Sequence, residues 1–360
     1  MSLMPSSPAA DAPDLALCVD LDGTLLDSDI LYESLLALLA RQPLYLFLLP
    51  FWLMQGKAVL KRQIAARVTL QPEHLPYNPQ VLELLRNTTQ RPRVLCTASD
   101  ALLVAPIAAH LGLFERVMAS DGEHNLSGTR KAKALVDAFG ERGFDYVGNG
   151  KVDLAVWRWA AGAWVVNNDD RLARAAAEHT RVHAHWPAPP RAAAWVKALR
   201  LHQWLKNLLV FVPLLTAHRF LEPQAVVQAL LAFVAFSLCA SGVYVLNDLL
   251  DLGADREHQR KRRRPFAAGR LPLLHGLLVA PLLTAAGLLV ALACSPAFAA
   301  VLLIYYVATL AYSLRLKRVV MLDVVLLAGL YTVRIIGGTI AIDAELSFWL
   351  LAFSMFIFLS

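Results

Sequence analysis

The stretch Asn247–Arg270, which reads NDLLDLGADREHQRKRRRPFAAGR, lies between two long apolar runs and carries two blocks of opposite charge. If its first acidic residues continue the preceding run as a helix, they share one helix face and repel one another. A divalent cation would offset that repulsion, and Mg²⁺ binds one or two carboxylates together with phosphate oxygens. The stretch therefore predicts a site for a metal-bound diphosphate, with a solvated basic loop as the alternative. The acidic residues are Asp248, Asp251 and Asp255, and the cations are Arg256, Arg260, Lys261, Arg262, Arg263 and Arg264.

The C-terminal part of the chain predicts a bundle of membrane-spanning helices. Ala225–Leu246 carries no formal charge and would be about 33 Å long as a helix, enough to cross a hydrocarbon core about 30 Å thick. Residues 191–360 therefore predict an all-α polytopic transmembrane domain with about six spans. The other five expected spans are Leu273–Cys294, Ala297–Ser313, Val319–Ile342 and the shorter runs Trp204–Ala217 and Phe348–Ser360.

The charges divide the chain into two parts. Residues 1–190 hold 18 Lys+Arg and 20 Asp+Glu, a net charge of −2, whereas residues 191–360 hold 16 and 8, a net charge of +8. The cations of the second part gather in the connections 247–272 and 314–318, and basic connections face the cytoplasm. We expect a multi-pass protein of the inner cell membrane whose partner is the lipid bilayer, with residues 1–190 in the cytoplasm and no nucleic-acid partner.

Two charged residues lie inside the run Val319–Ile342, where charge is costly and usually functional. Asp323 and Arg334 are eleven residues apart, about three helical turns, so both point to nearly the same helix face. We expect them to line a polar cavity, and an ion pair made for packing is the alternative.

The acidic stretch resembles the first acidic motif of the UbiA-type intramembrane prenyltransferase superfamily, N-D-x-x-D-x-x-x-D. The decaprenyl-phosphate phosphoribosyltransferase branch is the one it resembles most. The segments ALRLHQWLKNLLVFVPLL (Ala198–Leu215) and YSLRLKRVVMLDVVLLAGLYTVRIIGG (Tyr312–Gly338) resemble the same branch. The resemblance implies a helical bundle with a polar cavity that opens to the cytoplasm, and Mg²⁺ bound at the aspartates. The residues that match the motif are Asn247, Asp248, Asp251 and Asp255.

The same resemblance implies the chemistry. In that branch the donor is phosphoribosyl diphosphate and the acceptor is a polyprenyl phosphate. Other members transfer a prenyl chain from its diphosphate to an aromatic ring. Both reactions break a bond to diphosphate with help from Mg²⁺. Members usually have about nine spans, whereas this sequence stops within an apolar run, so we expect the membrane domain to be incomplete.

Further substrate contacts are expected outside the acidic motif. Lys206 and Asn207, at the start of the first run, resemble positions near the diphosphate. Tyr312 and Lys317 are expected at the polar mouth of the cavity. For these four residues a polar anchor at a helix end is the alternative. The residues of the basic block that would bind phosphates are Arg256, His258, Lys261 and Arg264.

The N-terminal part carries a second acidic motif in LALCVDLDGTLLDSD, Leu15–Asp29. An apolar strand runs into Asp20, and Asp22 follows two residues later. Carboxylates at the end of a strand suit phosphoryl transfer, in which one attacks phosphorus and the other protonates the leaving oxygen. Alternating strands and helices up to His185 predict a doubly wound α/β fold for residues 1–190.

This motif resembles that of the haloacid dehalogenase (HAD) superfamily, whose other motifs follow in order. RVLCTASD places Thr97 at the phosphate-binding hydroxyl position, and NLSGTRKAKAL offers Lys131 as the cation, with Lys133 as the alternative. In DYVGNGKVDLAVW, Asn149 stands where a metal-binding aspartate is expected. Asparagine removes one negative charge, so we expect Mg²⁺ affinity to fall. The Mg²⁺ ligands that the resemblance implies are Asp20, Asp22, Asn149 and Asp153.

Residues 25–87 are expected to form a helical cap after the first strand. Within them LYLFLLPFWLMQGK, from Leu44, is too short to span a membrane and contains Pro50. One interpretation is a buried cap helix. The other is an apolar patch that docks on the membrane interface or on the second domain, with Trp52 at headgroup depth.

Together these motifs predict a Mg²⁺-dependent membrane transferase with a fused phosphatase-like domain. The transferred group is expected to be phosphoribose, or a prenyl chain as the second choice. The fused domain would remove the 5′-phosphate that transfer of phosphoribose leaves. A phosphatase anchored by the bundle is one alternative, and a non-catalytic regulatory HAD domain, favoured by Asn149, is another.

Overall fold

The computed structural model describes residues 15–314 and 322–359 of the chain, with side chains omitted at 314, 322 and 323. The chain divides into two compact units. The first contains the described residues up to Arg191 together with Leu250–Leu273, and the second contains Ala192–Leu249 and the residues from Leu274 onwards. The segment that holds Asp251, Asp255 and the basic block therefore belongs to the first unit.

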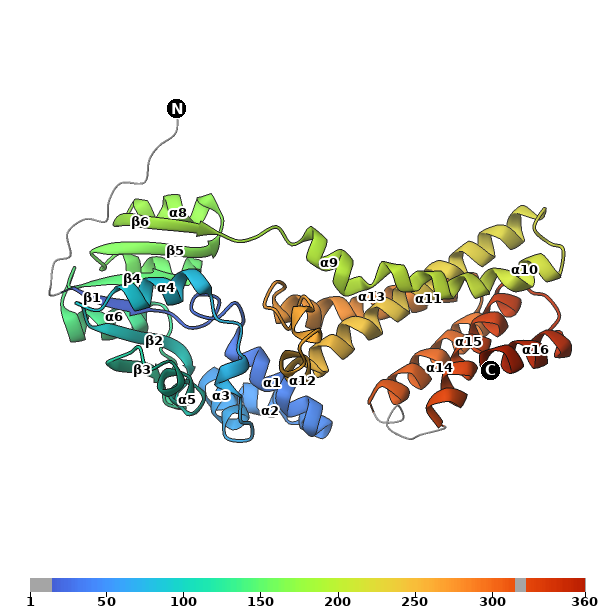
Figure 1. The fold of residues 1–360 in the computed structure, drawn as a ribbon, viewed down its shortest axis with the longest axis horizontal. Coiled ribbons are helices and arrows are strands. Elements are labelled where there is room, and N and C mark those ends of the chain that lie inside the picture. The colour runs from blue at the N-terminus through green and yellow to red at the C-terminus, as the bar shows by residue number, and fades with distance from the viewer. Residues whose placement is uncertain (1–14, 315–321, 360) are drawn as a thin grey trace, which may run out of the picture. The chain divides into compact units, whose positions relative to one another are not determined.

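A parallel sheet forms the centre of the first unit (Figure 1). Its described strands lie in the order β3-β2-β1-β4-β5-β6. The chain adds β2 and β3 on one side of β1 and then returns to add β4, β5 and β6 on its other side. The carboxyl ends of parallel strands share one edge of a sheet, and polar residues that follow them meet there. This topology confirms the predicted doubly wound α/β fold. The strands are β1 (Ala16–Val19), β2 (Arg93–Asp100), β3 (Arg116–Ser120), β4 (Phe144–Gly148), β5 (Gly162–Asn168) and β6 (Arg181–Pro187).

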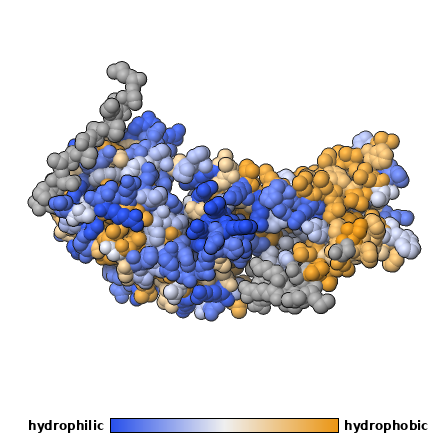
Figure 2. Space-filling model, viewed as in Figure 1, coloured by the Kyte–Doolittle hydropathy of each residue, from blue (hydrophilic) through white to orange (hydrophobic). Residues whose placement is uncertain are grey.

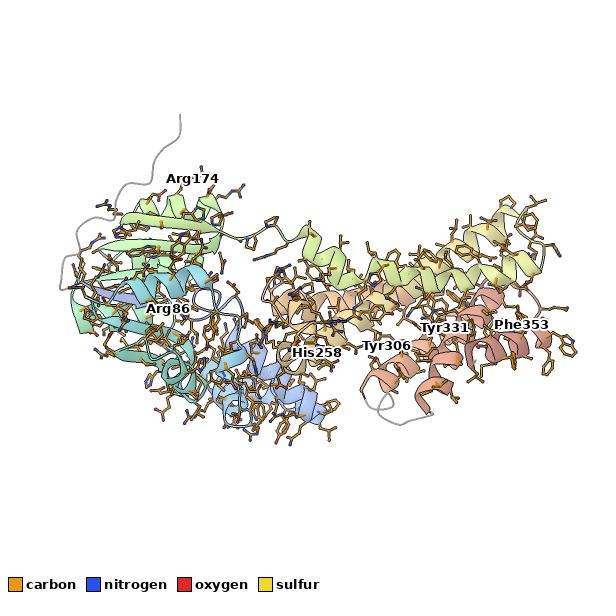
Figure 3. All side chains as sticks on the ribbon, in the orientation of Figure 1. Arg86, Arg174, His258, Tyr306, Tyr331 and Phe353 are labelled. Atoms are coloured by element: carbon orange, nitrogen blue, oxygen red, sulfur yellow. The ribbon has the colours of Figure 1, made fainter. Side chains whose placement is uncertain are left out.

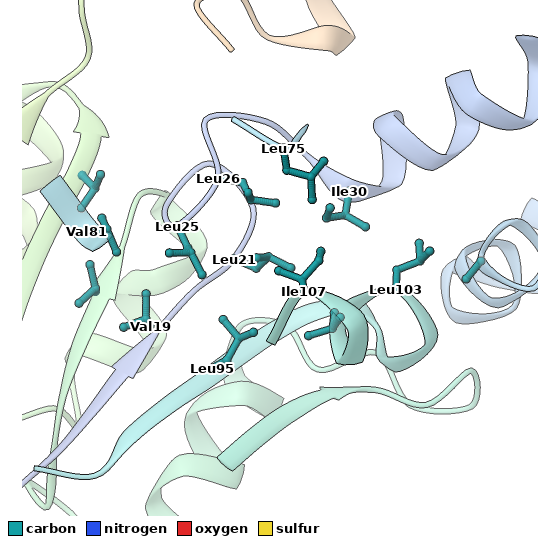
Figure 4. Close-up of a cluster of buried hydrophobic side chains, with 14 of the residues drawn as sticks. Val19, Leu21, Leu25, Leu26, Ile30, Leu75, Val81, Leu95, Leu103 and Ile107 are labelled. Carbon is teal, nitrogen blue, oxygen red and sulfur yellow. The ribbon is translucent and has the colours of Figure 1, made fainter. Parts of the chain in front are cut away.

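The central strand β1 is buried on both faces, as its uninterrupted apolar sequence ALCV requires. Alternate residues enter different cores. Leu17 and Val19 join one hydrophobic cluster, and Ala16 and Cys18 join the other. Figure 4 shows part of the first cluster, which continues beyond the strand into the turn that carries the acidic motif. The motif is thus held on a rigid base.

Helices surround this sheet, and polar side chains fix where several of them begin. Asp29 accepts hydrogen bonds from the amides of Leu31 and Tyr32 at the start of α1, and Asn78 does the same for α4. The helical cap is present as expected between β1 and β2. The helices are α1 (Ile30–Arg41), α2 (Leu49–Met54), α3 (Lys57–Ala65), α4 (Pro79–Asn87), α5 (Ala101–Leu111), α6 (Thr129–Phe139), α7 (Leu154–Trp157), α8 (Asp170–Ala177) and α12 (Leu252–Glu257), with 3₁₀ segments η1 (Pro43–Phe47), η2 (Pro72–His74), η3 (Lys151–Asp153) and η5 (Lys261–Arg263).

The apolar segment from Leu44 differs from the expected buried cap helix and from one detail of the expected docking patch. It forms η1 and α2 rather than one helix, and most of its large side chains are exposed, so a buried cap helix is wrong. Trp52 is only 6% exposed and packs in the first core, so its expected place at headgroup depth is also wrong. Pro50 lies in the first turn of α2, where its missing N–H costs nothing.

The second unit is made of helices, and hydrophobic residues dominate its visible surface in Figure 2. Among the described residues, α11, α13, α14 and α15 are long and apolar enough to cross a membrane. They confirm a helical membrane domain. The elements are α9 (Ala192–Leu199), η4 (Leu201–Phe211), α10 (Val212–Thr216), α11 (Pro223–Leu250), α13 (Leu273–Cys294), α14 (Pro296–Leu314), α15 (Leu322–Ala341) and α16 (Phe348–Leu359), with the end residues Leu250 and Leu273 grouped in the first unit.

Two sequence expectations fail within these helices. The run Trp204–Ala217 is not one spanning α-helix, because a 3₁₀ segment leads into the five-residue α10. The acidic motif does not lie on one unbroken helix either. The helix α11 ends at Leu250, and Asp251, with φ −86° and ψ 8°, separates it from α12.

Candidate active sites

Asp20 and Asp22 lie at the carboxyl end of β1, as the motif predicts. The amide of Asp20 donates to the carbonyl of Val147, 3.0 Å away, which fixes the turn to β4. Gly23 has φ +72°, and a Cβ there would lie 2.0 Å from the side-chain Nδ2 of Asn149. Only glycine suits that backbone and that space, so the tight turn holds the two carboxylates at the edge of the sheet.

Lys131, rather than Lys133, reaches the first carboxylate. Its Nζ lies 2.8 Å from Asp20 Oδ1 and 2.9 Å from the Tyr146 hydroxyl, whereas Lys133 is exposed on the same helix. Burial by itself would lower the pKa of Lys131, but the charges of Asp20 and Asp153 outweigh it and raise that pKa. Lys131 therefore stays protonated and offsets negative charge at Asp20.

Asp22 is surrounded by hydrogen-bond donors. Its Oδ1 accepts from the amide of Ile30 at 2.7 Å, and its Oδ2 accepts from Ser99 Oγ at 2.6 Å and from Thr97 Oγ1 at 3.4 Å. Burial first, and then the charges of Asp29 and Asp20, raise the pKa of Asp22 to about 7. A carboxyl that keeps its proton near neutral pH suits a general acid.

Sequence reasoning missed two residues at this edge. Ser99 lies two residues after Thr97 on β2, so the period of a strand could have indicated it. Lys61 comes from cap helix α3, and its Nζ donates to the carbonyl of Ala98 at 2.6 Å and to Asn125 Oδ1 at 3.0 Å. Burial lowers the pKa of Lys61, and the nearby charges of Asp22 and Asp29 oppose that shift. No local sequence signal indicates a cap residue that folds back onto a strand.

The predicted metal ligands at this edge are largely occupied by protein donors. Asp153 Oδ2 accepts from the amides of Asn149 and Gly150 at 3.0 and 2.9 Å, and its Oδ1 accepts from the Tyr146 hydroxyl at 3.1 Å. Burial and the charge of Asp20 raise the pKa of Asp153. Because Asn149 is neutral and the oxygens of Asp153 already accept three hydrogen bonds, this set of donors does not fit a Mg²⁺ site.

The first two residues of the membrane acidic motif are fixed within the second unit. Asp248 is buried and pairs with Arg200, whose Nη2 lies 2.6 Å from its Oδ1. Asn247 donates from Nδ2 to Ser313 Oγ at 2.9 Å, which connects α11 to α14. Arg200 also lies over the ring of Tyr244 at 4.9 Å, so both its position and its charge are defined.

Arg334 and Asn207 meet in the interior of the second unit. Arg334 Nε donates to Asn207 Oδ1 at 2.8 Å, and Nη2 donates to the Tyr305 hydroxyl at 2.8 Å. The rings of Tyr305 and Tyr331 lie 4.9 and 5.3 Å from the guanidinium carbon, and Figure 3 marks Tyr331. These partners are all neutral, so they orient the arginine without cancelling its charge. Such a group suits an anionic substrate.

Asp255 and Arg264 form an ion pair in the first unit. Arg264 Nη1 lies 2.6 Å from Asp255 Oδ2, whereas Asp255 Oδ1 is buried and has no hydrogen-bond partner. Burial raises the pKa of Asp255 although Arg264 opposes the shift. A buried carboxylate oxygen without a donor is costly, and a cation would satisfy it. This oxygen therefore fits a metal-binding role. Still, among the residues described, no three His, Cys, Asp or Glu side chains already surround a common metal position.

Arg256 is buried and is held by the cap. Its Nη1 and Nη2 lie 2.8 and 2.6 Å from the two carboxylate oxygens of Glu33 on α1, and its Nε donates to the carbonyl of Ala267 at 3.0 Å. Ser28 donates a further hydrogen bond to Glu33. These hydrogen bonds of Arg256 are all made within the first unit. No local sequence signal indicates the contact with Glu33, because the two residues are 223 positions apart.

The remaining predicted residues are placed as follows. His258 (marked in Figure 3) and Lys261 are exposed, and the amide of Arg260 donates to His258 Nδ1 at 3.2 Å. Lys206 is exposed with its Nζ 5.9 Å from the ring of Tyr331. Asp251 and Tyr312 are partly buried. Lys317 and the side chain of Asp323 lie outside the described residues, so their predicted roles stay predictions.

Membrane-length helices, a buried arginine among neutral partners and an N-D-x-x-D-x-x-x-D motif define a membrane-embedded transferase joined to a HAD-like α/β unit. The C-terminal part of the chain is a domain of the UbiA prenyltransferase family, whose model matches residues 208–360. The family membership confirms the resemblance stated above for the membrane domain.

Two curated relatives extend this comparison. The uncharacterised protein y4nM of Sinorhizobium fredii is 38% identical over 353 residues, which cover 96% of this chain and 68% of that protein. Decaprenyl-phosphate phosphoribosyltransferase of Mycobacterium tuberculosis is 37% identical over 174 residues, which cover 47% of this chain and 58% of that enzyme. The match therefore spans somewhat more than half the length of the phosphoribosyltransferase.

A solved structure resembles the chain more weakly. A HAD family hydrolase from Salmonella enterica serovar Typhi is 12% identical, with a TM-score of 0.35, and the match covers 48% of this chain and 67% of that one. The HAD-like description of the first unit rests on its own strand order and on the placement of Asp20, Asp22, Thr97 and Lys131.

Proposed function

We propose that the chain is a Mg²⁺-dependent transferase of the inner cell membrane that moves phosphoribose from phosphoribosyl diphosphate to a polyprenyl phosphate. The N-terminal unit would lie in the cytoplasm. The observation that carries the transferase proposal is the buried Arg334, held by Asn207 and Tyr305 in a form that suits an anionic substrate. The identity of 37% to decaprenyl-phosphate phosphoribosyltransferase supports phosphoribose as the transferred group.

The acidic motif would bind the donor. Asp248, Asp251 and Asp255 would hold Mg²⁺, which when bound would neutralise charge on the diphosphate as it leaves. Arg200 and Arg264 now pair with two of these aspartates, so both are placed to turn toward phosphate oxygens. The exposed Lys206 and Lys261, together with Lys317, would add positive charge at the entrance, where His258 and Tyr312 would add hydrogen-bonding groups.

The proposed transfer breaks the bond between the anomeric carbon of the ribose and the diphosphate oxygen. A new bond forms between that carbon and an oxygen of the lipid phosphate, and diphosphate carries away the electron pair. The anomeric carbon becomes electron-poor in the transition state, so negative groups nearby stabilise it. Arg334 would orient the anionic acceptor, and Asp323 on the same helix would line the polar cavity.

We also propose that the first unit hydrolyses the 5′-phosphate of the transferred group. Asp20 would attack phosphorus while protonated Asp22 gives its proton to the leaving sugar oxygen, and water would then release phosphate from Asp20. Thr97 would hold a phosphate oxygen, and Lys131 would offset the added negative charge. The contact between Lys131 and Asp20 and the raised pKa of Asp22 support this role.

The test uses the full chain in proteoliposomes with Mg²⁺, polyprenyl phosphate and phosphoribosyl diphosphate labelled in the ribose. We expect a labelled lipid product, and we expect Asp248→Ala to abolish it. Glu257→Ala, which removes an exposed acid beside the motif, is the matched control and should leave product formation unchanged. If no labelled lipid appears while a prenyl diphosphate and an aromatic acid do react, the phosphoribosyl assignment is wrong.

A further inference from the structure

A row of large apolar side chains is exposed on the cap of the first unit. Phe47 is 77% exposed and Met54 is 87% exposed, far more than side chains that contribute to a core. Water-exposed apolar groups this concentrated mark an interaction surface. We name the row the cap patch, and it consists of Leu44, Leu46, Phe47, Leu48, Phe51, Leu53 and Met54.

The fold holds the cap patch in place from behind. Trp52 points into the core, its ring centroid lies 5.7 Å from that of Tyr45, and the Arg67 guanidinium lies over both rings at 4.9 and 5.5 Å. Trp52 and Tyr45 occupy the inward face of η1 and α2, so the side chains of the cap patch point outward. The exposure therefore follows from the packing of the segment.

The charge around the cap patch is of one sign. Residues 34–72 contain five arginines and lysines and no acidic residue. Among them, Arg41 at the end of α1, Lys57 at the start of α3 and Arg67 just after α3 are exposed. Apolar side chains flanked by cations match a membrane surface with anionic headgroups. A second copy of the patch would bring like charges together, which disfavours self-association through it.

A bilayer is also within reach of this unit by covalent connection. Leu250–Leu273 belongs to the first unit, and its two ends continue into α11 and α13, which are long enough to span a membrane. Within that segment Arg256 pairs with Glu33 on α1, the helix that leads directly into η1. We propose that the cap patch inserts into the interfacial region of the bilayer and prefers anionic lipids. This holds whichever group the membrane domain transfers.

The test places a fluorescent reporter on the cap patch of the full chain in nanodiscs that contain phosphatidylglycerol. Phe47→Cys carries the environment-sensitive label in a Cys294→Ser background, because the other three cysteines are buried. We expect blue-shifted emission that lipids bearing a quencher on the acyl chain suppress. Arg174→Cys, on the exposed face of α8, is the reference (Figure 3). Its label should show no blue shift and no suppression by the lipid quencher.

Two outcomes would overturn the proposal. One is a label at position 47 that behaves like the label at 174, which means that the patch faces water. The other is a label shielded from water that lipid quenchers do not reach, which means that protein covers the patch. Loss of phosphoribosyl transfer would leave both readouts intact, so failure of the proposed function and failure of this proposal are distinguishable.

The charge requirement has its own variants. Arg41→Gln and Lys57→Gln should each lower the ratio of inserted to water-exposed label about fivefold in anionic discs, with little effect in phosphatidylcholine alone. Arg86→Gln removes an exposed cation from α4, outside the patch, and should change nothing (Figure 3). Equal insertion with and without anionic lipid would contradict the preference for negative headgroups.

Discussion

Asp22 combines two features that a general acid needs. It is buried beside Asp29 and Asp20, which raises its pKa to about 7, and its two oxygens are fixed by the amide of Ile30 and the hydroxyl of Ser99. About half of the Asp22 carboxyl groups therefore keep the proton at pH 7, and the carboxyl group itself is held in one place. Asp20, two residues earlier, carries the counter-ion Lys131 and is suited to attack instead.

Hydrolysis of a phosphomonoester by the full chain should fall as pH rises through about 7. The protonated form of Asp22 gives the leaving oxygen its proton, and at pH 8 about a tenth of that form remains. Initial rates between pH 5.5 and 8.5 would show the descending limb (about three pH units around the pKa). A rate that stays flat across neutral pH, or a profile that Asp22→Asn leaves unaltered, contradicts the role.

Ser99→Ala should move that descending limb to higher pH. The Ser99 hydroxyl donates to Asp22 and stabilises its charged form, so its loss raises the pKa of Asp22 further. The measurement is the same rate profile. Ser34→Ala is the control, because the Ser34 hydroxyl donates to the carbonyl of Leu31 and not to Asp22. A limb that stays in place would show that Ser99 does not influence the acid.

At the scale of elements, the segment Leu250–Leu273 matters most, because it carries half of the acidic motif and packs on the cap. The two-pronged contact between Arg256 and Glu33 joins α12 to α1, with both side chains under a tenth exposed. Gly269, at φ +69°, adds a close approach to Asp27. Asp255 owes its position to this packing.

Glu33→Gln should weaken the docking of this segment by about 3–5 kcal/mol, because it leaves the buried Arg256 without a counter-charge. Hydrogen exchange of residues 250–273 in the full chain measures the effect. The matched control is Glu222→Gln, which breaks an exposed pair with Arg219 and should leave exchange unchanged. Equal protection in both variants would show that the pair contributes nothing to docking.

Gly269→Ala should also loosen the segment, by about 1–3 kcal/mol. A Cβ at position 269 would lie 2.8 Å from both Cβ and the carbonyl oxygen of Asp27, and the backbone there has a positive φ. Gly253→Ala, in the same segment, meets nothing within 4 Å and should be neutral or slightly stabilising. Thermal unfolding of the two purified variants, compared with the parent chain, separates these outcomes. A neutral Gly269→Ala would contradict the tight approach.

Sequence patterns predicted the elements better than the contacts between them. The motif after β1 predicted Asp20 and Asp22 correctly at a strand end, because alternation and apolar runs are local signals. The break at Asp251 was not predicted, because nothing nearby in the sequence interrupts the helix period. The pair of Glu33 with Arg256 was beyond reach for a different reason, since it joins distant segments through tertiary packing.

At the scale of the whole molecule, two chemistries are joined in one chain. In the part of the chain that the structure describes, four long apolar helices follow a HAD-like unit, and hydropathy predicted their bounds to within a few residues. Hydropathy failed at Trp204–Ala217, where composition is apolar but the backbone forms a 3₁₀ segment before Pro213. Apolar composition reports where a segment can be buried and leaves its backbone conformation undetermined.

Asp20→Asn should separate the two proposed activities. The substitution removes the attacking carboxylate of the first unit, so transfer should continue while the lipid product keeps its 5′-phosphate. Thin-layer separation of products made from 5′-³²P-labelled donor would show phosphate retained on the lipid. If lipid transfer disappears together with hydrolysis, the bundle is an anchor for a phosphatase and the transferase proposal is wrong.

The bond between Arg256 and Glu33 also has a consequence for biosynthesis. Glu33 leaves the ribosome more than two hundred residues before its partner, and α11 must enter the translocon in between. Until then the nascent hydrolase-like unit holds a carboxylate in a site shaped for a guanidinium. The folding of this unit is therefore complete only after membrane insertion. A polypeptide released by premature termination before Arg256 would keep the unpaired carboxylate of Glu33, and proteases would degrade it more readily.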